Sequence, residues 1–342
     1  MQLRRVCTPS RFLFWCVVAM AFFVVLMIYD TFRECESEEL RATKRLLDNY
    51  HEQNQELKND QFILKKKLKE AEQQLSSLSS DGKSKWVPGL PVIYLITPTY
   101  TRMEQKAELT RLSQTLMHVK NIHWIVIEDA DAKTNLVARF LKQTGFNYTH
   151  LNVATPAHFK LASNDPSWLK PRGVLQRNAG LAWLRSNTKK QPGVLFFVDD
   201  DNTYSLRLFE EMRFTKKVSV WPVGIVGYLR YETPIVTDGK VTGWFTYFKP
   251  TRPFPMDMAG FAVNLALIHS HPGAGFSNEV ERGYQESTFL TGLGVTLDDL
   301  EPKANMCSEV LVWHTRTEKS SLRNEEKMWK KYGLQSDPNI EV

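Results

Sequence analysis

The feature that most constrains this chain is an uninterrupted apolar run near its N-terminus. Residues 12–29 contain no charged residue, no proline and no glycine. As a helix, this run reaches roughly 27 Å at about 1.5 Å per residue, which is just enough to cross a bilayer. A cleaved signal peptide is the alternative, but its apolar core is shorter, roughly 7–15 residues, and small residues follow it at the cleavage site. Here the run leads into LMIYD at 26–30, so we predict an uncleaved anchor.

Charges on either side of the run indicate its orientation. Arginines precede it and acids follow it, at Arg4, Arg5 and Arg11 on one side and at Asp30, Glu34, Glu36, Glu38 and Glu39 on the other. Cationic residues favour the cytosolic side, so the chain after residue 30 is expected in a lumen or outside the cell. We therefore predict a single-pass type II protein with a cytosolic tail at 1–11, a signal anchor at 12–29, a luminal stem at 30–90 and a folded luminal domain at 91–342.

The stem carries a heptad pattern between residues 40 and 78. Most a and d positions are apolar, and Asn54 and Gln61 supply polar layers. This is typical of a short parallel coiled coil, in which polar a positions set the register, although a single amphipathic helix gives the same pattern. Cys35 either cross-links two stems in an oxidising compartment or stays unpaired. From 76 to 89 the composition turns to Ser, Gly, Lys and Pro, which predicts a linker.

The formal net charge of +6 raises the question of nucleic-acid binding. Residues 1–29 contribute +3, residues 30–85 contribute −1, and residues 86–342 contribute the remaining +4. The surplus in the folded part is diluted over most of the chain, so we expect no nucleic-acid partner. The four cysteines form no C-x-x-C pair, which argues against a disulfide scaffold and a zinc ribbon.

The folded part alternates strand-like runs with helical patterns. Apolar, β-branched and aromatic runs occur at 92–97, 123–127, 148–153 and 194–198, and helical patterns occur between them at 103–119 and 173–186. This alternation is typical of an α/β domain with a largely parallel sheet. In such sheets ligands bind beyond the carboxyl ends of the strands.

Three adjacent carboxylates, Asp199, Asp200 and Asp201, follow the last of these strand-like runs. They repel one another unless a cation neutralises them. Hard oxygen ligands of this kind suit Mg²⁺ or Mn²⁺. The alternative is a solvated acidic turn that caps a helix at 205–215.

Short strings follow one another through the folded part: TPTY at 97–100, QKAEL at 105–109, QRN at 176–178, DDDNTYS at 199–205, FEEMR at 209–213, VSVWP at 218–222, RPF at 252–254, DMAGFA at 257–262 and VWHTRTEK at 312–319. In this order they closely resemble the β-1,3-glucuronyltransferase family, over roughly residues 91–342. The resemblance implies a GT-A fold, which is Rossmann-like and binds a nucleotide sugar. It also implies inverting, Mn²⁺-dependent transfer of glucuronic acid from UDP-glucuronate to the 3-hydroxyl of a terminal galactose, at the Golgi membrane and by a homodimer.

The resemblance further implies which residues bind the donor. They are Pro98, Tyr100, Asp129, Arg172, Arg177, Asp199, Asp200, Asp201, His314 and Arg316. Of these, Tyr100 and Asp129 would hold the uridine, and Asp201 would be the direct metal ligand. Arginine and histidine beside a diphosphate supply positive charge and directional donors where negative charge develops.

On the acceptor side, inversion needs a general base that removes the proton of the attacking hydroxyl. Glu286 matches the family's base. The matching acceptor-binding positions are Glu232, Phe248, Arg252, Asp257 and Asn324, the last of which would reach the acceptor site of a partner subunit. Phe248 stands where the family member that acts on the proteoglycan linker has Trp. The Gal-Gal-Xyl linker and N-acetyllactosamine are therefore equal candidates for the acceptor.

Two alternative functions belong beside this prediction. A membrane-tethered glycan-binding homologue without catalysis would lack the base or the acidic residues, and both are present. A related inverting transferase that uses another UDP-sugar would share the base, the metal site and the diphosphate groups.

The sequence also contains a candidate glycosylation site. Asn147 begins an Asn-Tyr-Thr sequon close to a predicted strand.

Overall fold

The computed structural model of the chain describes residues 9–82, 86–162, 165–166, 169–188 and 192–337. The chain divides into two compact units at the junction of Asp81 and Gly82. The N-terminal unit is helical and the C-terminal unit is a mixed α/β structure.

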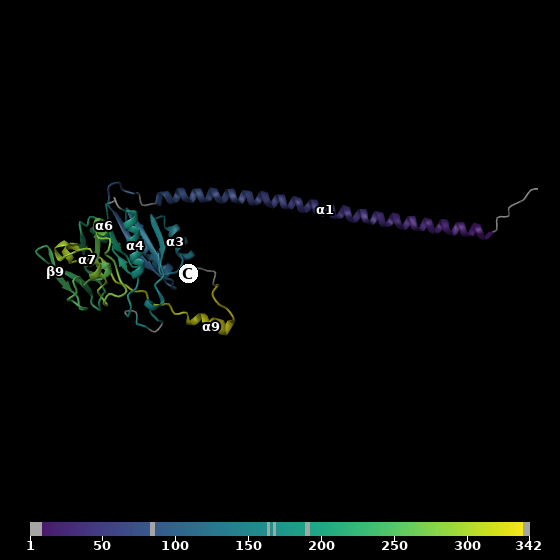
Figure 1. Cartoon of the computed structure of the whole chain (residues 1–342). Coiled ribbons are helices and arrows are strands. Elements are labelled where there is room, and N and C mark those ends of the chain that lie inside the picture. The colour runs from purple at the N-terminus through teal and green to yellow at the C-terminus, as the bar shows by residue number, and fades with distance from the viewer. Residues whose placement is uncertain (1–8, 83–85, 163–164, 167–168, 189–191, 338–342) are drawn as a thin grey trace, which may run out of the picture. The chain divides into compact units, whose positions relative to one another are not determined.

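The N-terminal unit is one continuous helix, α1 (Pro9–Gly82), purple to blue in Figure 1. Its stretch Phe14–Thr31 has a mean hydropathy of 2.1 and is long and apolar enough to cross a membrane. The Thr31 hydroxyl donates to the carbonyls of Met27 and Ile28, so this polar group is satisfied within the helix. This stretch is compatible with the predicted membrane anchor. Arg4 and Arg5, which support the orientation, lie outside the described residues.

The stem follows the apolar stretch without a break in α1. Four leucines of the heptad pattern are exposed on the helix, at Leu40, Leu47, Leu57 and Leu64. This is expected in one isolated chain if the seam of a coiled coil is covered only when two stems pair. The pairing of two stems stays a prediction. The side chain of Cys35 lies outside the described residues. The helix continues to Gly82, so the prediction of a linker from residue 76 is wrong for the first part of that stretch.

A seven-stranded sheet forms the larger part of the C-terminal unit, with the strand order β11-β6-β10-β4-β1-β2-β3. The strands β1 to β4 pair in parallel, β10 runs antiparallel to both β4 and β6, and β11 runs parallel to β6. The bounds are β1 (Val92–Thr99), β2 (Ile122–Glu128), β3 (Tyr148–Asn152), β4 (Gly193–Phe197), β6 (Val218–Val220), β10 (Phe261–Asn264) and β11 (Leu300–Pro302).

A smaller five-stranded sheet has the order β5-β12-β7-β8-β9. Its bounds are β5 (Thr203–Tyr204), β7 (Val223–Gly224), β8 (Tyr231–Thr237), β9 (Lys240–Phe245) and β12 (Val312–Trp313). The helices of this unit are α2 (Gln105–Leu116), α3 (Asn135–Thr144), α4 (Val174–Asn187), α5 (Leu206–Met212), α6 (Leu265–Ser270), α7 (Gln285–Gly292), α8 (Ala304–Cys307) and α9 (Arg323–Tyr332), with 3₁₀ turns η1 (Ala157–Phe159), η2 (Met258–Gly260) and η3 (Leu297–Asp299).

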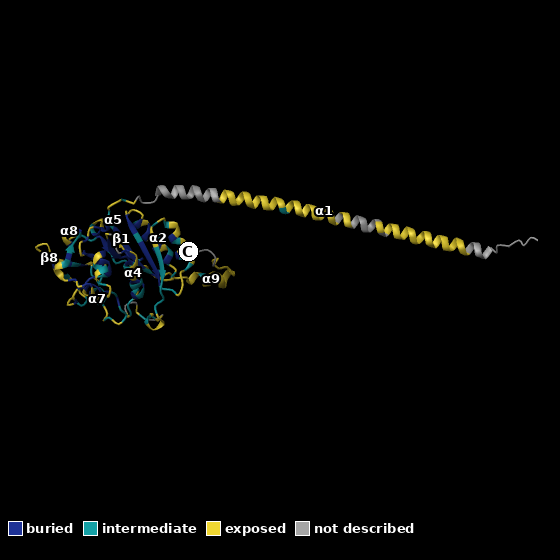
Figure 2. Cartoon of the chain, turned by 45° about the horizontal axis from the view of Figure 1, so that its top comes forward, coloured by how far each residue is buried: buried dark blue, intermediate teal, exposed yellow. Residues whose placement is uncertain are grey.

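Alternate residues of the central strand β1 build two hydrophobic cores, one on each face of the large sheet. Tyr94 and Ile96 belong to the core that also contains residues of α4 and α7, whereas Ile93 and Leu95 belong to the core that contains residues of α2 and α3. The strand is buried almost throughout, as Figure 2 shows for β1. Burial on both faces explains why this run is continuously apolar, and the predicted α/β class is confirmed.

Candidate active site

The carboxyl ends of β1, β2 and β4 meet at one edge of the large sheet. Thr99 at the end of β1 pairs with Glu128 at the end of β2, and the backbone N–H of Asp129 donates to the Thr99 carbonyl at 2.8 Å. The Thr99 hydroxyl donates to Asp200, just beyond β4, at 2.7 Å. The strand ends singled out in the sequence therefore lie together, at the edge where α/β sheets bind ligands.

The acidic triplet, Asp199, Asp200 and Asp201, divides into two paired carboxylates and one unpaired carboxylate. Asp199 Oδ1 accepts a hydrogen bond from Arg177 Nη2 at 2.5 Å. Asp200 Oδ1 lies 2.8 Å from Arg102 Nη2. Within the part of the chain that the structure describes, no side chain or amide donates to the Asp201 carboxylate. The triplet therefore leaves one negative charge for a ligand.

Asp201 is the member of the triplet best suited to hold a cation. Burial, with the charges of Asp199 and Asp200, raises the pKa of Asp201. A bound cation would offset both the desolvation and the repulsion between the carboxylates. Asn202 Oδ1 next to it is buried without a partner among the described residues. No group of three or more His, Cys, Asp or Glu side chains in the described ranges is arranged to hold a metal ion. The Asp201 carboxylate with Asn202 Oδ1 beside it nevertheless fits a divalent cation of the Mg²⁺ type. Such a cation is bound by one or two carboxylates plus substrate phosphates and water.

Arg177 is fixed by a close approach at the start of α4. Gly173, the N-cap residue, has a φ of +73°, and a Cβ there would lie 2.6 Å from Arg177 Nη1 and 3.1 Å from Pro98. Arg177 Nη1 donates to the Arg172 carbonyl at 2.9 Å. Its Nε is buried and lacks a partner among the described residues. Since an unsatisfied buried donor is costly, this nitrogen indicates a place for an anionic ligand.

His314 brings a second cationic group from the small sheet. It follows β12, and its Nδ1 lies 2.8 Å from Asp257 Oδ2. This hydrogen bond raises the pKa of His314 and so favours the imidazolium. Burial acts to raise the pKa of Asp257, but the hydrogen bond and charge of His314 outweigh it, and that pKa lies below its ordinary value. The hydrogen bond and the two pKa shifts thus favour the charged forms of both residues.

Glu286 lies in the first turn of α7. Burial, together with the charge of Asp257, raises the pKa of Glu286 to about 7, against the opposing charges of Arg252 and Arg177. The residue as a whole is half-buried. A carboxyl group whose pKa lies near the working pH is suited to general-base catalysis.

Glu232 and Arg252 are buried polar residues among the predicted acceptor-binding positions. Glu232 Oε1 accepts from the Thr246 hydroxyl at 2.5 Å, and burial raises its pKa. Arg252 donates to the backbone carbonyls of Phe248, at 3.1 Å, and of Gly283. Its guanidinium also lies 5.5 Å from the centre of the Phe248 ring. Arg252 therefore ties the segment that carries the aromatic ring to the segment that leads into α7.

Tyr100 and Asp129 lie at the ends of neighbouring strands. Tyr100 directly follows β1, and its side chain is 45% exposed, which leaves aromatic surface for a ligand. Both carboxylate oxygens of Asp129 accept hydrogen bonds from Thr155, one from its amide at 2.7 Å and one from its hydroxyl at 2.8 Å. The orientation of Asp129 is therefore set by the protein.

Four predicted residues make no hydrogen bond or ion pair through their side chains to the site residues described above, among the described residues. Arg172 and Arg316 are exposed, although the charge of Arg316 acts on the pKa of His314. Asn324 lies in the first turn of α9, which is exposed along its length in Figure 2, and no contact among the described residues joins it to the other candidates. Asn147 is exposed just before β3.

Three further residues contact the acidic triplet. The Thr315 hydroxyl and Arg111 Nη2 both donate to the backbone carbonyl of Asp201, at 2.5 and 2.8 Å. Arg102, already described, pairs with Asp200. Thr315 lies within one of the family's strings and Arg102 lies two residues after Tyr100, so both carry a signal in the sequence. Arg111 resembles any surface residue of a helix.

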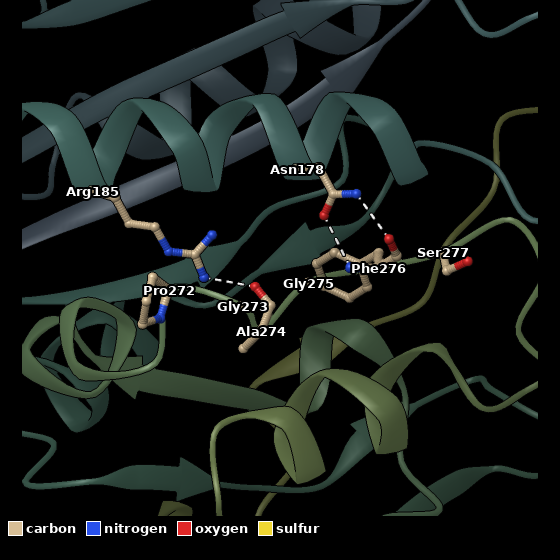
Figure 3. A pocket seen from close by; sticks show the side chains of 8 residues that line it. All are labelled: Asn178, Arg185, Pro272, Gly273, Ala274, Gly275, Phe276 and Ser277. Carbon is tan, nitrogen blue, oxygen red and sulfur yellow. Dashed lines mark hydrogen bonds between the residues drawn. The ribbon is translucent and has the colours of Figure 1, made fainter.

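A separate hollow of about 350 Å³ lies beside α4, and no candidate residue lines it (Figure 3). The Asn178 amide exchanges two hydrogen bonds with the backbone of Phe276, at 2.8 and 2.9 Å. Arg185 Nη2 donates to the Ala274 carbonyl at 2.6 Å. Both side chains are thus engaged with the protein's own backbone, and they tie α4 to the segment that precedes α7. The lining residues are Asn178, Arg185, Pro272, Gly273, Ala274, Gly275, Phe276 and Ser277.

A largely parallel sheet whose carboxyl edge carries an acidic triplet paired with arginines is the arrangement expected of a nucleotide-sugar glycosyltransferase with a GT-A fold. The model of glycosyltransferase family 43 matches residues 112–318, and the chain belongs to this family. The chain is therefore an enzyme of the glycosyltransferase class, and the resemblance found in the sequence is confirmed.

Two human relatives agree with this assignment. Galactosylgalactosylxylosylprotein 3-beta-glucuronosyltransferase 1 of Homo sapiens is 56% identical over 262 residues, which cover 75% of this chain and 77% of that protein. Galactosylgalactosylxylosylprotein 3-beta-glucuronosyltransferase 2 of Homo sapiens is 57% identical over 242 residues, which cover 70% of this chain and 73% of that protein. Among solved structures, S. aureus TarS (residues 1–349) matches with a TM-score of 0.43 at 14% identity, over 66% of this chain and 60% of that one.

Proposed function

We propose that the chain transfers glucuronic acid from UDP-glucuronate to the 3-hydroxyl of a terminal galactose, with inversion at the anomeric carbon. The observation that carries the proposal is the half-buried carboxyl of Glu286 in the first turn of α7, whose pKa is raised to about 7 by desolvation and by the charge of Asp257. The names of the two human relatives describe glucuronosyltransferases, which supports glucuronate as the transferred sugar.

On the donor side, Tyr100 and Asp129 would bind the uridine. Arg177 Nε, which lacks a partner among the described residues, and His314, whose raised pKa favours the imidazolium, would supply donors and positive charge for the diphosphate or the glucuronate carboxylate. Pro98, Arg172 and Arg316 complete this side. Asp201 would hold Mn²⁺, and the metal, when bound, supplies charge that stabilises the UDP leaving group.

On the acceptor side, Glu232, Arg252 and Asp257 would bind galactose hydroxyls, and Phe248 would contact a sugar ring. Glu286 accepts the proton of the 3-hydroxyl while that oxygen attacks the anomeric carbon of the donor. The new glycosidic bond forms as the bond from that carbon to the β-phosphate oxygen breaks, and the electron pair leaves with UDP. A single displacement converts the α-linked donor into a β-linked product.

Two acceptors remain in the proposal. The names of the human relatives point to the galactosylgalactosylxylosyl linker. Phe248, which is smaller than the Trp of the family member that acts on the linker, makes terminal N-acetyllactosamine an equal candidate. Comparison of kcat/KM for the linker trisaccharide and for N-acetyllactosamine, with UDP-glucuronate as the donor, decides between them.

The proposal includes the setting of the enzyme. The tail at 1–11, the anchor at 12–29 and the stem at 30–90 would place the catalytic domain at 91–342 in the Golgi lumen. The enzyme would be a homodimer in which Asn324 reaches the acceptor site of its partner, and the exposed Asn147 would be open to glycosylation.

Replacement of the base tests the proposed function. We expect Glu286→Gln to abolish transfer while UDP binding, measured by calorimetry with Mn²⁺ present, stays unchanged. Asp298→Asn is the control, because Asp298 is an exposed carboxylate paired with Lys240, and it should keep full activity. In the unmodified enzyme, kcat/KM should fall about tenfold per pH unit below pH 7, as Glu286 becomes protonated. Full activity of Glu286→Gln would exclude the proposed mechanism.

A further inference from the structure

We propose that Arg102 is a positioning residue of the donor site with two tasks: it supports the ring of Tyr100 from one side, and it keeps Asp200 from joining Asp201 as a cation ligand. This inference rests on the proposed binding of UDP and a divalent cation.

The ion pair between Arg102 and Asp200 is well shielded and directional. Arg102 Nη2 lies 2.8 Å from Asp200 Oδ1, and the two side chains are only 13% and 8% exposed. The other carboxylate oxygen, Oδ2, accepts the Thr99 hydroxyl at 2.7 Å, and Gln105 Nε2 donates to that hydroxyl at 3.1 Å. Both oxygens of Asp200 are therefore engaged, and the orientation of this carboxylate is fixed.

Arg102 also contacts Tyr100 in two ways. Its guanidinium carbon lies 4.7 Å from the centre of the Tyr100 ring, and Nη1 donates to the Tyr100 carbonyl at 3.3 Å. A guanidinium at this distance attracts the electron-rich face of the ring. The ring remains 45% exposed, so a planar nucleobase can stack on the surface that Arg102 leaves open. The same cation thus sets both the aromatic surface and the carboxylate next to it.

These two tasks predict opposite effects when Arg102 is lost. Asp200 would be released, and two neighbouring carboxylates bind a divalent cation more tightly than one. Tyr100 would lose its support, and binding of the nucleobase would weaken. A residue that only stabilised this edge of the sheet would weaken both kinds of binding when removed.

Arg111 provides a matched control. It donates to the backbone carbonyl of Asp201 at 2.8 Å and pairs with Glu108. In the described part of the chain no contact joins it to Tyr100 or Asp200. Arg111→Gln therefore removes the same charge from the neighbourhood of the acidic triplet without touching either partner of Arg102.

The experiment measures binding to the full-length protein in detergent. The proteins compared are the unmodified chain, Arg102→Gln, Arg102→Lys, Tyr100→Ala, the double variant Tyr100→Ala with Arg102→Gln, and Arg111→Gln. Free Mn²⁺ is followed by electron paramagnetic resonance in the absence of nucleotide. UDP and inorganic pyrophosphate, which lacks a base, are titrated by calorimetry at saturating Mn²⁺. Thermal unfolding establishes that each variant is folded.

For Arg102→Gln we expect the Kd for Mn²⁺ to fall about fivefold, the Kd for UDP to rise about fivefold, and the Kd for pyrophosphate to stay within about twofold. Arg102→Lys, which keeps the charge, should retain Mn²⁺ affinity. In the Tyr100→Ala background, Arg102→Gln should cause no further loss of UDP affinity.

The inference is overturned if Arg102→Gln weakens Mn²⁺ binding, if UDP and pyrophosphate lose affinity equally, or if Arg111→Gln gives the same pattern. If Arg102→Gln does not fold, the decision passes to Arg102→Lys, and a loss of its Mn²⁺ affinity overturns the inference. Failure of the unmodified protein to bind UDP would instead overturn the proposed function, and the inference with it.

Discussion

At the scale of single residues, the environment of Glu286 decides what this carboxyl group does. In the sequence it is one glutamate among many, and only the family resemblance singles it out. In the structure, burial and the charge of Asp257 raise its pKa to about 7. This shift makes the protonation of Glu286 measurable as a pH dependence of stability as well as of rate.

The raised pKa has a definite sign in the free energy of unfolding. The ordinary value is 4.5 and the folded value about 7, so the folded state holds the proton more tightly. The stability that this gives is present below about pH 4.5 and is lost as the pH rises through 7. Glu286→Gln, which imitates the protonated form, should be more stable than the unmodified protein at pH 8 by up to about 3 kcal/mol.

Thermal unfolding of both proteins at pH 4.5 and at pH 8, without ligands, tests this. The difference between them should grow with pH. A difference that is the same at both pH values would show that Glu286 is not buried in the way described.

A second prediction concerns the unusual backbone of α8. All four of its residues have positive φ, between 53° and 62°, although none is glycine. L-residues with a side chain pay roughly 1–2 kcal/mol for this conformation. Met306 is 49% exposed, so its replacement disturbs little packing.

We therefore expect Met306→Gly to be more stable than Met306→Ala by about 1 kcal/mol, measured by chemical denaturation. Both variants lose the long side chain, and only the glycine relieves the backbone. An alanine variant as stable as the glycine variant would contradict the strain in this turn.

At the scale of elements, the contact between α4 and the segment before α7 holds two parts of the site in register. Asn178 directly follows Arg177, and it pairs with both backbone groups of Phe276 (Figure 3). Phe276 in turn stacks on Phe289 of α7, with ring centres 4.8 Å apart. The helix that carries Arg177 is thus joined to the helix that carries Glu286.

Asn178→Ala should destabilise this junction, because it leaves the N–H and the carbonyl of Phe276 without their partner. We expect a loss of about 2 kcal/mol in the free energy of unfolding. The control is Asn187→Ala on the same helix, since Asn187 is exposed and, among the described residues, donates only to the Trp183 carbonyl within α4. It should cost less than about 0.5 kcal/mol. Equal losses in the two variants would show that the Asn178 contact has no special role.

Four strands of the large sheet, β1 to β4, were predictable, whereas its other three strands and much of the small sheet were not. The runs that become β1, β2 and β4 are apolar because both faces of the sheet are covered there, so composition alone locates them. The edge strand β3 is only half-buried, and its β-branched and aromatic residues are the signal that locates it. By contrast, β5, β7 and β12 have two residues each, too few to show any alternation. Their positions depend on contacts between distant segments, such as the pairing of Val312 with Tyr204 and Val223.

The same limit applies to the site. The rule that ligands bind at strand ends locates Asp199 to Asp201 from the sequence. The partners of these residues come from elsewhere in the chain, and neither composition nor spacing predicts that Arg102 pairs with Asp200 or that His314 pairs with Asp257. Family resemblance supplied His314 and Asp257 as candidates, and the geometry adds Arg102.

At the scale of the whole molecule, the stem should help to hold two copies together. Leu57 and Leu64 occupy d positions of the heptad pattern and are exposed on α1. Replacement of both by Glu would place charges in the seam, and we expect the dimer dissociation constant of the detergent-solubilised protein to rise roughly tenfold or more. The control combines Gln55→Glu with Asn59→Glu, which adds the same charge outside the seam. It should leave the dimer dissociation constant unchanged. Sedimentation equilibrium distinguishes these results, and equal effects would exclude a coiled coil in this register.

The central claim, transfer of glucuronate with inversion, is tested most directly by a donor panel. The full-length protein in detergent is incubated with Mn²⁺, a galactose-terminated acceptor and, in turn, UDP-glucuronate, UDP-galactose and UDP-N-acetylglucosamine. The product is then analysed by nuclear magnetic resonance. We predict that only UDP-glucuronate is used efficiently and that the product carries a β-linked glucuronate on the 3-position of galactose. Preferential transfer of galactose or N-acetylglucosamine, or an α-linked product, would contradict the account.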